Sequence, residues 1–162
     1  MPVRHNTKEF IAGMEKKQRA VHALTERIAT KAGNIMRDEI KNEIPPHNPG
    51  VSQWKGWEAK GTLKSQVVHT AVTAIPKGHS VTVYMNLNAN TRKYAVAHEE
   101  GMTIRAKTPR GMIFYSIPHG RFIRRMTVTI RPKHYWSTGV ETSKRKIREM
   151  VPKEISVTFK EG

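Results

Sequence analysis

Apolar residues in the first quarter of the chain recur mostly at intervals of three, four or seven, which is the repeat of one helix face. They are Phe10, Met14, Val21, Leu24, Ile28, Ala32, Ile35 and Ile40. Asn6 and Glu9 have the spacing of a helix capping box, and Pro45-Pro46 cannot continue a helix. The pattern predicts one helix of about 38 residues, or ~57 Å. A helix that long either lies across its own sheet or contacts a second subunit.

Shorter elements follow. Residues 45–60 contain three prolines with Trp54 and Trp57, which predicts an ordered loop whose tryptophans pin it to a core or stack on bases. Thr62 is expected to cap a short helix that presents Leu63, Val67, Ala71 and Val72 on one face. Alternation over residues 81–86 predicts a strand after a Pro76-Lys77-Gly78 turn, and Tyr94–Gly101 is typical of one or two helical turns.

Three strands are predicted in the second half of the chain, at Met102–Ala106, Met112–Ile117 and Phe122–Ile130. Turn residues at 109–111 and 118–120 separate them, so we expect antiparallel hairpins. Thr138 and Glu141 resemble another capping box, which predicts a C-terminal helix that Pro152 ends or kinks. A final edge strand at residues 155–159 is expected after it.

These elements predict an α+β fold in which a long N-terminal helix and a C-terminal helix pack on an antiparallel β-sheet with a projecting basic hairpin. The 162 residues fit a single domain. Its expected parts are the long helix (1–44), the Pro/Trp loop (45–60), short helices and antiparallel strands (61–136), and a C-terminal helix and tail (137–162).

Charge is distributed unevenly along this chain. The net charge is +16, yet residues 1–44 hold nine Lys or Arg against six acidic residues. Between Met102 and Arg148, twelve Lys or Arg accompany a single acid, Glu141. A β-rich surface of one sign requires a polyanion or an acidic partner.

The residues expected to make that contact are Arg105, Lys107, Arg110, Arg121, Arg124 and Arg125. They could bind phosphates, with Phe114, Tyr115 and Phe122 as stacking platforms, or meet acidic side chains of a neighbouring protein. For packing between subunits, the expected positions are Leu24 and Ile28 on the first helix and Ile147 and Met150 on the last.

Catalytic and cofactor-binding patterns are not found in the sequence. The chain has no cysteine, which excludes disulfides and thiolate chemistry. His98-Glu99-Glu100 lacks the second histidine of a zinc-protease helix, and His119 and His134 have no carboxylate nearby. The basic region also has too few acids for a metal-dependent nuclease. We therefore expect no enzyme, cofactor or metal, and a soluble protein without a signal peptide or membrane span.

Three segments in a fixed order resemble tail-completion, or neck, proteins of tailed bacteriophages. They are Gly61-Thr62-Leu63-Lys64-Ser65, Tyr94-Ala95-Val96-Ala97-His98-Glu99-Glu100-Gly101, and Arg131-Pro132-Lys133-His134-Tyr135-Trp136 before the last helix. The resemblance implies an α+β virion protein that forms a homo-oligomeric ring, expected to be a hexamer, at the top of the tail.

The partners that the resemblance implies are the head–tail connector and the tail-terminator or tail-tube proteins, with packaged DNA as a possible contact. Two other classes of function stay open on the residues alone. One is a free nucleic-acid-binding protein that uses the basic strands directly. The other is a nuclease or toxin, for which a single carboxylate or histidine substitution would abolish plasmid cleavage.

Overall fold

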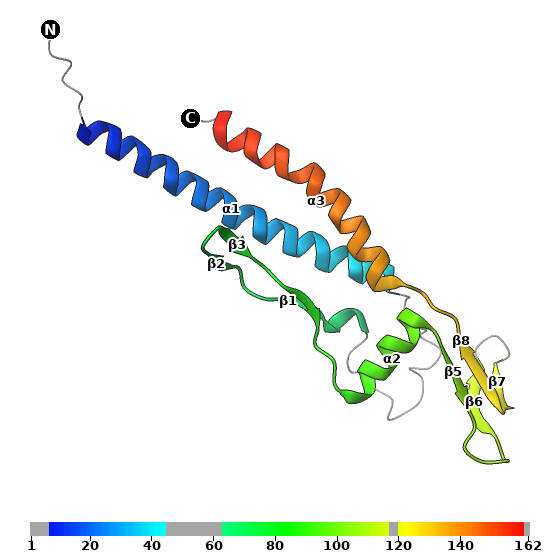
Figure 1. Cartoon of the computed structure of the whole chain (residues 1–162). Coiled ribbons are helices and arrows are strands. Elements are labelled where there is room, and N and C mark those ends of the chain that lie inside the picture. The colour runs from blue at the N-terminus through cyan, green and yellow to red at the C-terminus, as the bar shows by residue number, and fades with distance from the viewer. Residues whose placement is uncertain (1–6, 45–62, 117–119, 161–162) are drawn as a thin grey trace, which may run out of the picture.

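Three helices alternate with two interrupted β-hairpins in the part of the chain that the computed structural model describes, residues 7–44, 63–116 and 120–160 (Figure 1). The helices are α1 (Thr7–Glu43), α2 (Ala89–Glu100) and α3 (Tyr135–Lys160), with a 3₁₀ turn, η2, at Leu63–Gln66. The strands are β1 (Val67–His69), β2 (Thr73–Ile75), β3 (Gly78–Ser80), β4 (Val83–Met85), β5 (Met102–Arg105), β6 (Met112–Ser116), β7 (Arg121–Arg125) and β8 (Thr127–Ile130). No described helix is long and apolar enough to cross a membrane.

The first hairpin, called hairpin 1 below, runs from Val67 to Met85. Strand β1 pairs with β4 and β2 pairs with β3, all antiparallel. The register shifts by one residue between the two pairs, because Ala71 and Val72 lie opposite Val81 alone. This is the arrangement of a β-bulge, which bends a hairpin and turns its outer half. The short helix expected over residues 62–72 is therefore wrong beyond Gln66: this segment is rich in β-branched residues, which favour strands.

The second hairpin, hairpin 2, runs from Met102 to Ile130. Strand β5 pairs with β8, and β6 pairs with β7. We expected the Pro109-Arg110-Gly111 turn to join two paired strands, and this expectation is wrong. The turn is part of an insertion in one side of the hairpin, opposite a kink at Met126. Hairpin 2 lies at the end of the molecule away from the N-terminus of α1 (Figure 1).

Helices α1 and α3 form an antiparallel pair, as three contacts in reversed order show. Gly139 lies against Ile40, Lys146 pairs with Glu39 at 2.6 Å, and Glu154 pairs with Lys31 at 2.6 Å. A Cβ on Gly139 would lie 2.7 Å from the Cα of Ile40, so glycine allows the two backbones to approach closely. The small core next to this crossing contains Ile40, Ile44, Val67 and Tyr135.

Helix α3 continues through Pro152 to Lys160, so the expected edge strand at residues 155–159 is wrong. Contacts beyond the proline hold this last part of the helix against α1. Glu154 pairs with Arg27 at 3.2 Å and with Lys31, and Arg27 contacts the hydroxyl of Thr158. Thr138 is also not the start of α3, which begins at Tyr135.

The predicted fold class is confirmed: a long N-terminal helix and a C-terminal helix accompany small antiparallel sheets. The sheet is divided into four two-stranded pairs. The long helix is unbroken over 37 residues, and Gly33 does not bend it but makes room for Val81 of hairpin 1. The Asn6 cap, the Pro/Trp loop with Trp54 and Trp57, and the Thr62 cap lie outside the described residues.

Candidate functional site

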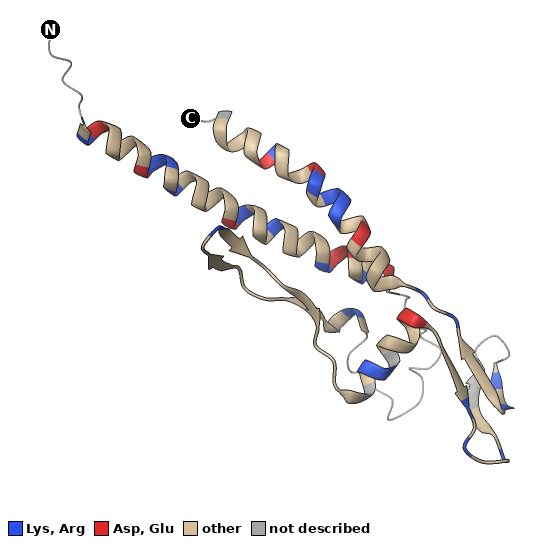
Figure 2. Cartoon of the chain, in the orientation of Figure 1, with Lys and Arg blue, Asp and Glu red and all other residues tan. Residues whose placement is uncertain are grey.

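Hairpin 2 carries all six of the cations expected to contact a partner. Every one of them, from Arg105 to Arg125, is exposed, and residues 102–130 contain no acid. In Figure 2 the ribbon of hairpin 2 carries blue Lys and Arg segments and no red segment. Within the described ranges, no acidic side chain forms an ion pair with any of these six. Their charge is therefore available to a partner.

Register places these cations on more than one side of the hairpin. Arg124 lies opposite Ile113 and Arg125 opposite Met112, so the two adjacent arginines point to opposite faces of the β6–β7 pair. Arg105 shares a face with Thr127, while Lys107 and Arg110 lie in the insertion between β5 and β6. A ligand that used all six would have to surround the hairpin.

Exposed apolar side chains accompany these charges. Ile113 is 63% exposed, and Phe122 and Met126 are each 53% exposed. Met102 and Ile104, on one face of the β5–β8 pair, are also exposed. The surface of hairpin 2 therefore combines positive charge with apolar area, a composition found at protein interfaces as well as at nucleic-acid contacts.

The base of hairpin 2 is held between α2 and α3. Gly101 ends α2 with φ +79° and lies so close to Pro132 that a Cβ there would be 2.9 Å from the Pro132 Cδ. The Lys133 amide donates to the His98 carbonyl at 2.7 Å. These contacts fix the point from which both strands leave the helices.

Glu99 completes this base by capping α3. Its carboxylate accepts the Trp136 amide at 2.9 Å, the Ser137 amide at 3.1 Å and the Ser137 hydroxyl at 2.7 Å. Burial opposes ionisation of Glu99, but the hydrogen bonds from Ser137 and Trp136 hold its pKa below the usual value. Glu99 therefore satisfies backbone amides at the N-terminus of α3 that have no partner within the helix.

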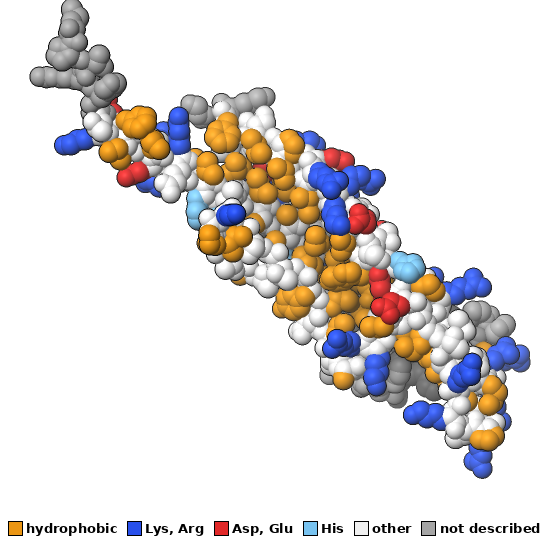
Figure 3. Space-filling view, viewed as in Figure 1, with side chains coloured by type: hydrophobic (Ala, Val, Ile, Leu, Met, Phe, Trp, Pro, Cys, Tyr) orange, Lys and Arg blue, Asp and Glu red, His pale blue; other side chains and the backbone are white. Residues whose placement is uncertain are grey.

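A second exposed surface is the first half of α1. Residues 7–23 are all exposed, and Phe10, Ile11, Met14 and Val21 are 46–68% exposed. Figure 3 shows these orange side chains near the N-terminal end, and others over the far end of α3. The exposed residues at that end of α3 are Ile155, Val157 and Phe159.

The predicted subunit-packing residues adjoin this surface. Leu24 is buried within the single chain, whereas Ile28, Ile147 and Met150 are half-buried. Phe10, Met14 and Val21 continue the helical face of Leu24 and Ile28 toward the N-terminus, where α3 no longer follows. The exposed part of this face is therefore a better candidate for contact with another chain than Leu24 itself.

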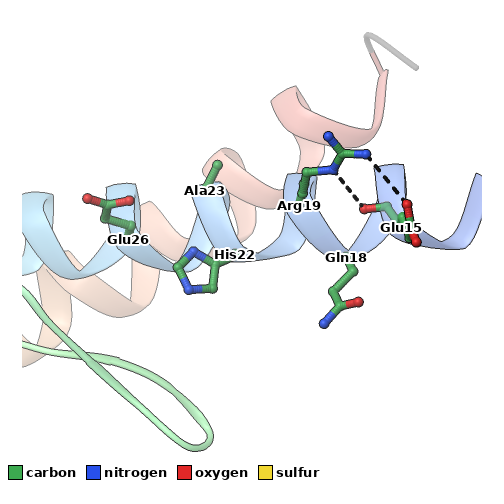
Figure 4. A pocket seen from close by; sticks show the side chains of 6 residues that line it. All are labelled: Glu15, Gln18, Arg19, His22, Ala23 and Glu26. Atoms are coloured by element: carbon green, nitrogen blue, oxygen red, sulfur yellow. Dashed lines mark hydrogen bonds and ion pairs between the residues drawn. The ribbon is translucent and has the colours of Figure 1, made fainter. Parts of the chain in front are cut away.

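A shallow hollow on α1 is lined by Glu15, Gln18, Arg19, His22, Ala23 and Glu26 (Figure 4). All six residues come from one helix, and Arg19 contacts Glu15 through the carboxylate at 3.9 Å and the backbone carbonyl at 3.4 Å. An open depression on a single helix cannot enclose a substrate. We assign it no catalytic role.

One group of possible metal ligands occurs among the described residues: His22, Glu26 and His79. In the sequence, the residues considered as metal ligands were His98, Glu99, His119 and His134 instead. The spacing of His22 and Glu26, one helical turn apart, could have drawn attention to them. The approach of His79, 53 residues after Glu26, depends on the packing of hairpin 1 and could not be read from spacing. Residue His119 lies outside the described part of the chain.

No protein-family model, no curated protein and no solved structure matches this chain.

Proposed function

We propose that this chain is a non-enzymatic structural subunit of the neck of a tailed bacteriophage virion. In this proposal, copies assemble as a ring at the top of the tail and join it to the head connector. The observation that carries the proposal is hairpin 2, with six exposed cations, no acid and several exposed apolar side chains. The order of the three segments that resemble neck proteins supports it.

Electrostatics supports an assembled role. A net charge of +16 on 162 residues produces self-repulsion that an acidic partner would relieve. The cations of hairpin 2 are concentrated at one end of the molecule, on more than one side of the hairpin, so an acidic surface that surrounds the hairpin could meet all six (Figure 2). The connector, the tail-terminator or tail-tube proteins, or packaged DNA would supply that surface.

The apolar face of α1 supports contact with further copies. Residues 7–23 extend ~25 Å as a helix. Isolated helices of about this length are marginal in water without packing. The Phe10, Met14 and Val21 face lies next to the α1–α3 pair, so a neighbouring subunit could extend that packing. A closed ring, expected to be a hexamer, would bury this face on every copy.

The test is assembly with the candidate partners. Purified chain is mixed with the tail-tube and connector proteins of the same phage, and the products are examined by negative-stain electron microscopy and light scattering. We expect rings that join the two partners. The double variant Arg124→Glu/Arg125→Glu should lose the joint, whereas the control Arg92→Glu/Lys93→Glu, with the same charge change on exposed α2 positions, should keep it.

Unchanged joining by the Arg124→Glu/Arg125→Glu variant would contradict the electrostatic role of hairpin 2. The second candidate function, direct binding of nucleic acid, predicts a different result. Affinity for a short duplex would fall steeply with salt, with a log–log slope of about −0.9 for each phosphate contacted. A log–log slope near −5, about that expected for six phosphate contacts, would favour nucleic-acid binding by the free protein if duplex binding is also lost in the Arg124→Glu/Arg125→Glu variant.

A further inference from the structure

Three metal-ligating side chains from two distant parts of the chain meet near the outer end of hairpin 1. His22 and Glu26 lie one turn apart on α1, and His79 lies in β3. One potential ligand atom from each residue lies within 4.8 Å of the other two. The rings of His22 and His79 are arranged edge to face, with centroids 4.4 Å apart.

The fold fixes this approach. Hairpin 1 packs along α1, where Gly33 leaves room for Val81, the residue opposite the bulge. The bulge turns the outer half of the hairpin, which carries His79, relative to its inner half. His22 and Glu26 are exposed, while His79 is half-buried. One ligand is therefore held by packing, and two are free to adjust.

Thr25 orients His79. The Thr25 hydroxyl donates its only proton to the His22 carbonyl, at 2.9 Å, and it lies 2.9 Å from the His79 Nδ1. A hydroxyl whose proton is used in this way accepts from Nδ1, an arrangement that would leave the Nε2 lone pair free for a ligand. Metal-binding histidines usually have such an outer hydrogen bond, which fixes the tautomer and the ring orientation.

We propose that His22, Glu26 and His79 bind a divalent transition-metal ion of the zinc class. Two imidazoles and one carboxylate are a ligand set suited to zinc, cobalt or nickel rather than to magnesium or calcium. Ligand atoms of a tetrahedral site with bonds of about 2.1 Å are ~3.4 Å apart, so small rotations of the two exposed side chains would complete the geometry. Three protein ligands leave one position for water.

Bound metal would fasten the outer half of hairpin 1 to the middle of α1. This consequence is independent of the proposed assembly role, because the three ligands lie outside hairpin 2 and off the Phe10–Met14–Val21 face. The strong positive charge of the chain disfavours non-specific cation binding, so a saturable site would stand out from a low background.

The test is binding of Zn²⁺ by the full chain after a chelator has removed any metal. Binding is measured by isothermal titration calorimetry and by the rise in Tm. We expect one equivalent to bind and to raise Tm. Co²⁺ should give the visible absorption of a low-coordinate site. His22→Ala, Glu26→Gln and His79→Ala should each lose the one-equivalent binding, and Thr25→Val should weaken it about 10- to 100-fold.

His134→Asn is the control: it removes an exposed histidine elsewhere, and asparagine tolerates the positive φ at that position. It should bind Zn²⁺ like the parent chain. Because His22 is exposed on a helix, His22→Ala remains informative even if His79→Ala does not fold. Absence of saturable binding to the parent chain, or binding that survives His22→Ala, would overturn the proposal.

Discussion

Glu99 is the residue through which α2, hairpin 2 and α3 are connected. Its carboxylate accepts three hydrogen bonds at the N-terminus of α3, and its backbone carbonyl accepts the His134 amide at 3.3 Å. Two of the segments that resemble neck proteins, Tyr94–Gly101 and Arg131–Trp136, therefore meet in space. This contact gives the residues of both segments a structural role and requires no catalytic one.

Replacement of Glu99 by alanine should destabilise the fold by about 1 to 2 kcal/mol, because the capping interactions of α3 are lost. The change is measured as the free energy of unfolding in urea at pH 7. Since the folded pKa of Glu99 lies below its usual value of 4.5, its contribution is complete at neutral pH and disappears as the pH falls through that folded value. The exposed neighbour provides the control: Glu100→Ala should change stability little, and an equal loss in both variants would refute the cap.

His98 predicts a separate response to acid. Burial, and then the charge of Lys133, lower the pKa of His98. The unfolded chain therefore binds this proton more readily than the folded chain, and stability falls as the pH drops below about 6.5. Tm measured from pH 7.5 to 5.5 should decrease less in His98→Gln than in the parent chain. Identical slopes would show that His98 does not contribute, since the other histidines act equally in both proteins.

Between elements, the close approach of α1 and α3 depends on Gly139. A Cβ there would collide with the backbone of Ile40, so Gly139→Ala should force the helices apart and cost about 1 to 3 kcal/mol. Gly13 is the matched control, since nothing lies within 4 Å of a Cβ at that helical position. Gly13→Ala should stabilise by about 0.5 to 1 kcal/mol. Thermal unfolding distinguishes these opposite signs, and a loss of the same size in both would contradict the packing argument.

The sequence predicted elements best where one periodic pattern was long. The repeat from Phe10 to Ile40 correctly indicated α1, and Gly101 correctly marked the end of α2. Predictions from the sequence were wrong where a local preference, such as that of proline to end a helix, was outweighed by contacts with distant residues. Pro152 does not end α3, because Glu154 and Thr158 hold the following turns against α1.

Of the candidate surfaces, the composition could be predicted from the sequence, whereas the pairing and the long-range contacts could not. The basic character of hairpin 2 follows from composition, since residues 102–130 hold six cations and no acid. The pairing of β5 with β8 does not follow, because a short turn at 109–111 favoured pairing with β6. The contact of His79 with α1 requires the one-residue shift at the bulge, which no local pattern encodes.

Over the whole molecule, the described helices and hairpin 1 pack together, while the strands of hairpin 2 pack chiefly against each other. Replacing residues 104–128 by Asn-Gly would keep the Thr103–Thr129 pair and close the ends with a two-residue turn. The shortened chain should retain its helical circular dichroism and cooperative unfolding but should not join partners. Loss of the helical signal would show that hairpin 2 is needed for folding.

Self-association is the second property of the whole molecule. Met14→Glu places a charge on the apolar face of α1 and should lower the oligomeric mass in light scattering without changing the fold. Lys16→Gln makes the same change in net charge on the other side of the helix and should leave the mass unchanged. Equal effects of the two variants would point to general electrostatics and against a packed interface.

The first and last residues of hairpin 2, Met102 and Ile130, are direct cross-strand partners, so the hairpin begins and ends at one place. Insertions or deletions between Met102 and Ile130 would leave the distance between the end of α2 and the start of α3 unchanged. The segment can therefore be exchanged, lengthened or trimmed without moving the helices that carry it. The segment is a natural site for grafting an epitope or a label.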